Sequence, residues 1–232
     1  MIQPSMMLAD IVATAPMTAR VLERHQIDYC CHGQRPLAGA CAEAGLDPVA
    51  VLAELEQAVI ESGPASIPDD VGGLIGHIVT NHHVYLRREL PLLGELMGKV
   101  VDAHAVAHPE VCEVAGTLAE LTADLLPHLA KEEQVLFPLA IQLLGAVEAT
   151  AFHCGSVLNP IRVMHAEHDR AGELLATLRY LTDSYTPPAD ACPTWRALYN
   201  GLAELEADTH RHVHLENNVL FPRIVQLEAD LA

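Results

Sequence analysis

The chain has 232 residues, half of them apolar, which suffices for one large core or for a small domain joined to a larger one. Acidic residues outnumber basic ones by 31 to 13, so the net charge of −18 disfavours binding to nucleic acid or to an anionic membrane. The first residues do not resemble a secretory signal, and no segment approaches the roughly 20 apolar residues of a membrane helix. We therefore expect a cytoplasmic protein.

The N-terminal quarter differs in composition from the rest. Residues 5–60 carry short helical patterns that proline and glycine interrupt, and residues 61–68 have the composition of a linker. We therefore expect a small helical domain over residues 1–65 and a second domain over residues 66–232.

The second domain has apolar residues at helical spacing in four stretches. Strand signals are weak and aromatic residues make up only 4% of the chain, which favours an all-α fold. Four helices with short connections indicate an up-down four-helix bundle. The four stretches are residues 70–97, 113–144, 158–183 and 193–229.

Histidine is unusually frequent, with 14 residues, and it is the commonest metal ligand among side chains. The six cysteines have no regular spacing, and the cytosol is reducing, so we expect free thiols rather than structural disulfides.

An internal repeat contains several of these histidines. The segment His128–Pro138 recurs 84 residues later as His212–Pro222, with the histidine, a glutamate and the VLFP tail in register. Upstream, His83 lies 45 residues before the first copy and His168 lies 44 before the second. The bundle thus reads as two related helical hairpins.

Each copy of the repeat can chelate a metal. Residues i and i+4 share one face of a helix, so His128 pairs with Glu132 and His212 pairs with Glu216. Such pairs on facing helices build carboxylate-bridged two-iron sites in bundles. Nitrogen and oxygen donors without thiolate disfavour a structural zinc site.

Neighbouring polar residues compete with this set. Only the register of the repeat favours His212 over its neighbours, and the same ambiguity affects the upstream histidines; we expect these neighbours to lie beside the ligands or in solvent. Glu133 is expected to face solvent, because it lies about 100° further round the helix than Glu132. The competing histidines are His82, His165, His210 and His214.

His104 cannot be assigned from spacing. It lies 21 residues after His83, which is about 30 Å along an unbroken helix. Both can serve one site only if the chain bends, for example at Pro91 or Gly94, and His108 is an alternative.

Four segments together resemble the repair-of-iron-centres family of the ScdA/YtfE type. The resemblance implies an N-terminal ScdA-type domain and a hemerythrin-like two-iron bundle. The segments are Asp28-Tyr29-Cys30-Cys31, His128-x-x-Lys131-Glu132-Glu133-Gln134-x-Leu136-Phe137-Pro138, Glu167-His168-Asp169-x-Ala171-Gly172-Glu173 and His212-x-x-x-Glu216-Asn217-Asn218-Val219-Leu220-Phe221-Pro222. The ligands that it implies are His83, His104, His128, Glu132, His168, His212 and Glu216.

The resemblance also implies a function. The cofactor would be two non-haem iron ions with an oxo or hydroxo bridge, and Glu132 and Glu216 would bridge them. The protein would repair iron-sulfur clusters damaged by nitrosative or oxidative stress, by donating iron to the damaged proteins, and would form a homodimer. Two alternatives are a nitric oxide reductase and a hemerythrin-like sensor of dioxygen or nitric oxide. About twelve metal bonds are needed, and this ligand set with its bridge leaves one position open for such a small ligand.

Cys30 and Cys31 form a second candidate site. The family motif has a small residue after the cysteine pair, whereas here His32 precedes Gly33. Adjacent thiols beside a histidine can bind iron or zinc, exchange disulfides with a partner or dock a damaged cluster protein. They can also be ordinary thiols in a turn.

Overall fold

The computed structural model describes residues 2–62, 67–146, 152 and 154–231. Within these ranges its regular elements are helical, as predicted. The elements are α1 (Leu8–Thr14), the 3₁₀ turn η1 (Pro16–Thr18), α2 (Ala19–Arg24), α3 (Leu37–Glu43), α4 (Pro48–Ser62), α5 (Val71–Ile78), the π-turn η2 (Val79–His83), α6 (Val84–His104), α7 (Val111–Lys131), the π-turn η3 (Glu132–Leu136), α8 (Phe137–Gly145), α9 (Leu158–Leu181), α10 (Pro193–Leu215), the π-turn η4 (Glu216–Leu220) and α11 (Phe221–Asp230).

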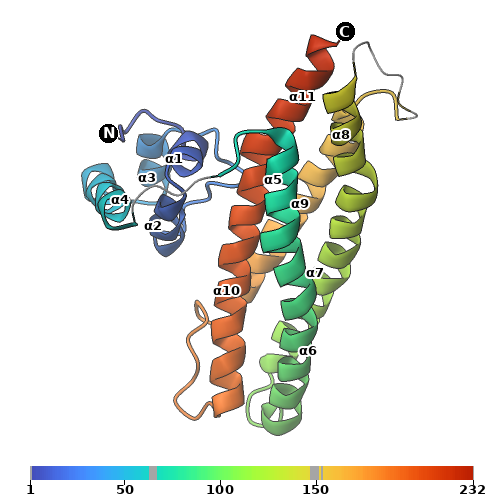
Figure 1. Ribbon diagram of the computed structural model, residues 1–232. Coiled ribbons are helices and arrows are strands. Elements are labelled where there is room, and N and C mark those ends of the chain that lie inside the picture. Colours follow the sequence, from blue (N-terminus) through green and yellow to red (C-terminus); the bar gives the residue numbers. More distant parts are fainter. Residues whose placement is uncertain (1, 63–66, 147–151, 153, 232) are drawn as a thin grey trace.

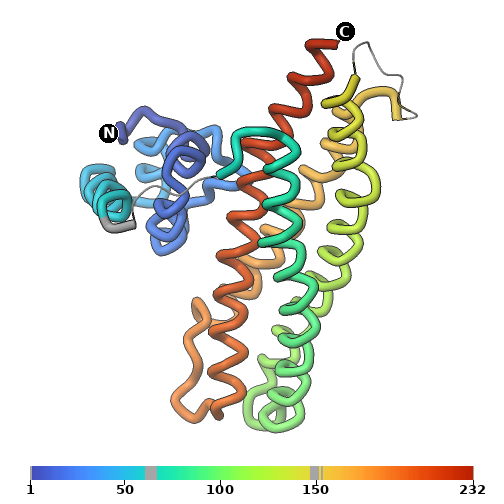
Figure 2. Tube along the Cα trace, viewed as in Figure 1, coloured from blue at the N-terminus to red at the C-terminus, as the bar shows by residue number. Residues whose placement is uncertain are grey.

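The second part of the chain is an up-down four-helix bundle, as predicted (Figure 1). Its four rods are α5–α6, α7–α8, α9 and α10–α11, and the tube in Figure 2 shows that each π-turn continues its rod without a break in direction. Helix α6 packs against α7 and α10, and α7 packs against α9. Every helix in the described ranges is either too short or too polar to traverse a bilayer.

The first rod is longer than the sequence predicts. Helix α6 continues to His104, past Pro91 and Gly98, where a helix end or bend was expected. Its buried residues include Leu90 and Val100, on both sides of these two positions. Burial of a continuous apolar face therefore outweighs the local cost of proline and glycine.

The N-terminal helices α1 to α4 pack around an apolar cluster of their own, beside α10 (Figure 1). Leu22, Leu37 and Leu55 are fully buried in this cluster, and Val213 of α10 enters it from the bundle. The N-terminal helices are therefore seated on the bundle at the level of η4, which α1 contacts. The predicted boundary between residues 65 and 66 lies outside the described residues.

A polar layer divides the core of the bundle. Along the first rod, Ile78 belongs to one apolar cluster and Leu86 to another. Along α9, Met164 and Ala171 are divided in the same way. One level of the bundle therefore belongs to neither apolar cluster. The upstream histidines of the two hairpins, His83 and His168, lie at that level.

Candidate metal centre

Three π-turns lie at the polar layer, and two of them begin at the glutamates of the repeat, Glu132 and Glu216. A proline follows each of these two turns, at Pro138 and Pro222. Proline lacks an N–H group and clashes with the carbonyl four residues earlier, so a standard helical turn is strained there. A π-turn has i→i+5 bonding and is common at functional sites. The repeated VLFP tail thus accounts for a repeated backbone shape at the two glutamates.

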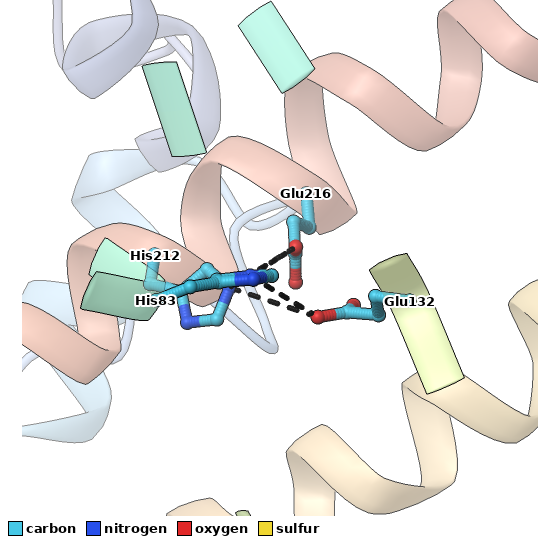
Figure 3. A group of neighbouring side chains, drawn as sticks. All are labelled: His83, Glu132, His212 and Glu216. Carbon is cyan, nitrogen blue, oxygen red and sulfur yellow. Dashed lines mark hydrogen bonds and ion pairs between the residues drawn. The ribbon is translucent and has the colours of Figure 1, made fainter. Parts of the chain in front are cut away.

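The polar layer gathers six buried side chains into two groups of four, and both glutamates belong to both groups. Within each group, one nitrogen or carboxylate oxygen per residue lies within 4.8 Å of all the others. Figure 3 shows the first group, with its side chains converging from separate rods of the bundle. The first group is His83, Glu132, His212 and Glu216, and the second is His128, Glu132, His168 and Glu216.

The distances between these atoms suit a cation at the centre of each group. Nε2 of His83 lies 3.2 Å from Nε2 of His212, and Nε2 of His128 lies 3.1 Å from Nε2 of His168. The two oxygens of Glu216 lie 3.0 Å from Nε2 of His212 and 3.1 Å from Nε2 of His168. Two ligand atoms at right angles, each about 2.1 Å from one metal ion, stand about 3.0 Å apart. The residues therefore fit a pair of metal ions.

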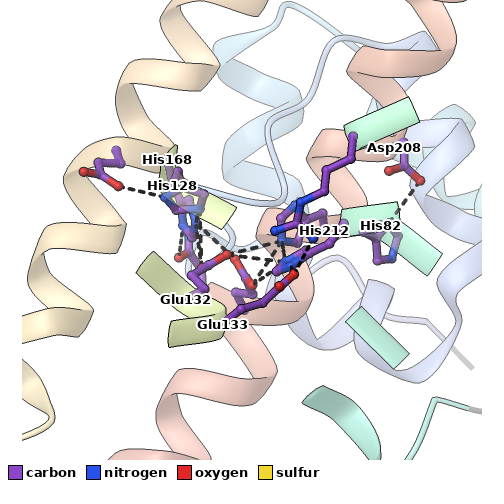
Figure 4. A network of polar contacts seen from close by, with 12 residues as sticks. His82, His128, Glu132, Glu133, His168, Asp208 and His212 are labelled. Carbon is purple, nitrogen blue, oxygen red and sulfur yellow. Dashed lines mark hydrogen bonds and ion pairs between the residues drawn. The ribbon is translucent and has the colours of Figure 1, made fainter. Parts of the chain in front are cut away.

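Hydrogen bonds from the opposite ring nitrogens orient three of the four imidazoles (Figure 4). Because Nδ1–H donates to these acceptors, Nε2 carries a lone pair that points into the cluster. The carboxylate oxygens of Glu132 and Glu216 correspondingly have no hydrogen-bond partner among the described residues, although ring nitrogens approach them. The three bonds run from His83 Nδ1 to Glu133 Oε1 (2.7 Å), from His128 Nδ1 to Glu167 Oε2 (2.9 Å) and from His168 Nδ1 to Asn217 Oδ1 (2.8 Å).

Burial keeps two histidines of the cluster in the uncharged form that a metal requires. Burial, and next the neighbouring imidazole, lower the pKa of His83 and of His128 to about 4, so both rings are uncharged at neutral pH. Burial raises the pKa of Glu132, and the carboxylate of Glu216 raises it further. Two carboxylates in one sealed layer repel each other, and a bound cation would remove that penalty.

Both parts of the chain match known protein families, and the bundle matches a cation-binding domain. Residues 74–224 match the family model of the hemerythrin HHE cation-binding domain, and residues 5–59 match the ScdA N-terminal model, described as a domain of unknown function. Iron-sulfur cluster repair protein YtfE of Enterobacter sp. strain 638 is 39% identical over 219 residues, which cover 93% of this chain and 94% of the relative. The chain belongs to the YtfE family of iron-sulfur cluster repair proteins. YtfE proteins of Citrobacter koseri and Escherichia coli are 38% and 37% identical over the same shares of both chains.

His104 does not join the cluster, although the resemblance to the YtfE family placed it among the ligands. Because α6 is unbroken, His104 lies at the far end of the bundle from the polar layer. Its ring packs against Trp195, with 4.9 Å between ring centroids. The structure thus brings together six of the seven predicted residues of the bundle.

Sequence reasoning missed the three acceptors that orient the imidazoles, although the repeat contains two of them. Glu133 and Asn217 occupy equivalent positions, each directly after the glutamate of its copy, and each accepts from the upstream histidine of one hairpin. Glu133 is half-buried and also binds Arg87 (2.7 Å), so the prediction that it faces solvent is wrong.

The residues just before the two upstream histidines form a second equivalent pair. Glu167 accepts from His128, whereas His82 stacks on His212 with 5.6 Å between ring centroids and an interplanar angle of 6°. His82 is itself held by Asp208, 3.0 Å away. The residues around the cluster thus follow the same internal symmetry as the candidate ligands.

Cys30 and Cys31 lie in the connection between α2 and α3, next to the bundle. Cys30 is buried, Cys31 is half-buried and both thiols are free. The side chain of Asn218, two residues after Glu216, donates to the backbone carbonyl of Cys30 (2.9 Å). The cysteine loop is therefore fixed to the π-turn that carries one of the clustered glutamates.

Proposed function

We propose that the chain holds two iron ions in the polar layer and donates iron to iron-sulfur proteins whose clusters nitric oxide or peroxide has damaged. The observation that carries the proposal is the pair of buried four-residue groups that share Glu132 and Glu216. Imidazole and carboxylate donors at this spacing suit non-haem iron, and shared carboxylates suit bridging of two ions. The relatives named for cluster repair supply the class of client.

Bound iron would supply redox chemistry and an open position for nitric oxide or dioxygen. The protein offers four histidines rather than the five expected, which leaves an additional position for small ligands.

In this proposal iron is also the cargo, and the carboxylates control its release. Glu132 and Glu216 are the two anionic members of the six, so they hold ferric iron more strongly than ferrous iron. Reduction would therefore loosen the bonds from these carboxylates first. The free thiols are consistent with a reducing compartment, and we place the reaction in the cytoplasm.

The proposal is tested by following iron and clusters together. The purified protein, reduced and free of oxygen, is mixed with a [4Fe-4S] protein that has lost iron, and both the cluster absorbance and the iron left on the chain are measured. We expect cluster recovery in proportion to iron lost. The His128→Ala variant should carry less iron and repair poorly, whereas His104→Gln should retain both properties.

A second arm separates the alternatives. The reduced protein is exposed to nitric oxide, and the gas produced is measured. Many turnovers to nitrous oxide without loss of iron would identify a nitric oxide reductase, and reversible binding alone would identify a sensor. Full retention of iron in the presence of the damaged client would refute donation.

A further inference from the structure

The loop between α2 and α3 contains a second set of potential metal ligands, separate from the polar layer. One carboxylate oxygen of Asp28 and the Sγ atoms of Cys30 and Cys31 all lie within 4.8 Å of one another. The backbone N–H groups of Cys30 and Cys31 both donate to Oδ1 of Asp28, at 3.0 Å each. The loop therefore folds around the carboxylate and turns both thiols to the same side.

The spacing of these atoms is that of ligands around one tetrahedral ion. The two sulfurs are 3.8 Å apart, and Sγ of Cys30 lies 3.3 Å from Oδ1 of Asp28. Two thiolates bound at about 2.3 Å to one tetrahedral ion stand about 3.8 Å apart, and a thiolate and a carboxylate oxygen stand about 3.5 Å apart. In the structure the thiol of Cys30 is within hydrogen-bond distance of both Oδ1 of Asp28 and Sγ of Cys31, and a cation would lie among these three atoms.

The surroundings also favour a cation. His32 holds the other carboxylate oxygen of Asp28 at 2.5 Å from its Nδ1 atom, in the way that outer partners orient metal ligands. The three candidate ligands line a cleft of about 860 Å³ between this loop, α9 and α10. The cleft supplies an open side from which a fourth ligand can enter, and its charge attracts cations. Besides Asp28 its acidic residues are Glu23, Asp169, Glu173, Asp183 and Glu206, against one arginine, Arg179.

The loop is also connected to the metal centre of the bundle. Asn217 accepts a hydrogen bond from His168 (2.8 Å) and lies 3.4 Å from the carbonyl of Cys30, to which it donates. A Cβ atom added to Gly172, one helical turn beyond His168, would lie 4.0 Å from Sγ of Cys31. The two sets of ligands are thus neighbours with different chemistry.

We infer that Asp28, Cys30 and Cys31 form a metal site of their own, which binds one thiophilic divalent cation such as zinc or ferrous iron and leaves a fourth position open to the cleft. Two thiolates and one carboxylate select softer ions than the imidazole and carboxylate set in the bundle. The inference does not depend on iron donation by the bundle.

Cobalt(II) is the probe, because thiolate-bound cobalt has a charge-transfer absorption that cobalt bound by nitrogen and oxygen lacks. The iron-loaded protein, with all six thiols confirmed reduced, is titrated with cobalt(II) without oxygen. We expect one equivalent to bind with a thiolate band. The band should disappear in Cys30→Ser and in Cys31→Ser and persist in Cys192→Ser, a matched control at the far end of the bundle.

The exposed residue His32 supplies a variant that leaves the buried loop intact. His32→Gln should weaken cobalt binding by about 10- to 100-fold, the usual effect of removing an outer partner. The iron spectrum of the bundle should be the same in every variant, which shows that each is folded. Absence of a thiolate band in the unmodified protein, or a band that survives both serine variants, would overturn the inference.

Discussion

The hydrogen bond between Glu133 and His83 allows a quantitative test of the metal centre. In Glu133→Ala, the Nδ1 atom of His83 loses a carboxylate acceptor at 2.7 Å, and Arg87 loses its partner at the same distance. A hydrogen bond to a charged group contributes about 1.5–3 kcal/mol. Loss of an outer partner lowers metal affinity by about 10- to 100-fold, which is about 1.4–2.8 kcal/mol. The two independent ranges agree, so we expect a loss of affinity in that interval.

The measurement is a competition between the protein and a chelator of known affinity, followed by the iron spectrum. Glu133→Gln keeps an oxygen acceptor without its charge and should fall between the unmodified protein and Glu133→Ala. Glu120→Ala is the matched control, because Glu120 lies on the same rod and forms an exposed pair with Arg170. An affinity for Glu133→Ala within twofold of that control would refute the role assigned to the bond.

Three further predictions concern other parts of the chain. A hydrogen bond from His104, and next the backbone N–H groups at the start of α10, lower the pKa of Cys192 to about 7. Its thiolate fraction, and therefore its alkylation rate by mass spectrometry, should rise around pH 7, and His104→Leu should move that midpoint upward. Gly33→Ala places a Cβ atom 2.5 Å from a backbone carbonyl, so the unfolding midpoint in urea should report a loss of about 1–3 kcal/mol. In a chelator, Glu132→Gln should be more stable than the unmodified protein by about 1–3 kcal/mol, because burial and the carboxylate of Glu216 penalise the charged form of Glu132 and raise its pKa, and iron should reverse this order.

Each of these predictions has a result that contradicts it. An unchanged alkylation midpoint in His104→Leu would remove the imidazole from the environment of Cys192. An unfolding midpoint for Gly33→Ala equal to that of the unmodified protein would mean that the loop relaxes freely. A metal-free Glu132→Gln variant less stable than the metal-free unmodified protein would show that the carboxylate of Glu132 is already compensated.

The repeat explains why so much of the metal centre was predictable. A histidine and a glutamate four residues apart, in two register-matched copies, specify both a helical face and its symmetry partner, so His128, Glu132, His212 and Glu216 follow from local geometry alone. The upstream histidine His83 stands nearly as far before its copy as His168 does before the other, but only the family resemblance separated it from His82. Pairs of ligands on one helix can be predicted because their spacing in the sequence fixes their spacing in the structure.

The errors arise where local rules meet long-range packing. A bend in α6 was allowed by its proline and glycines, but the apolar face continues past them, and this continuity placed His104 far from the cluster. Glu133 was misplaced because rotation by about 100° per residue holds for an α-helix, whereas this residue lies inside a π-turn, which has more residues per turn. The cleft beside Cys31 depends on how the loop meets α9, which no sequence spacing reports.

The π-turns at Glu132 and Glu216 change the direction in which the side chains after them point around the helix axis. A π-turn uses one residue more than an α-turn, so the helix before it can aim its donors at the centre while the helix after it aims Phe137 or Phe221 at the apolar core. Deleting Gln134 would return the α7–α8 rod to uniform winding and rotate everything beyond it by about 100°. Phe137 would then turn out of the core, so the length of the repeat unit is as constrained as its chemistry.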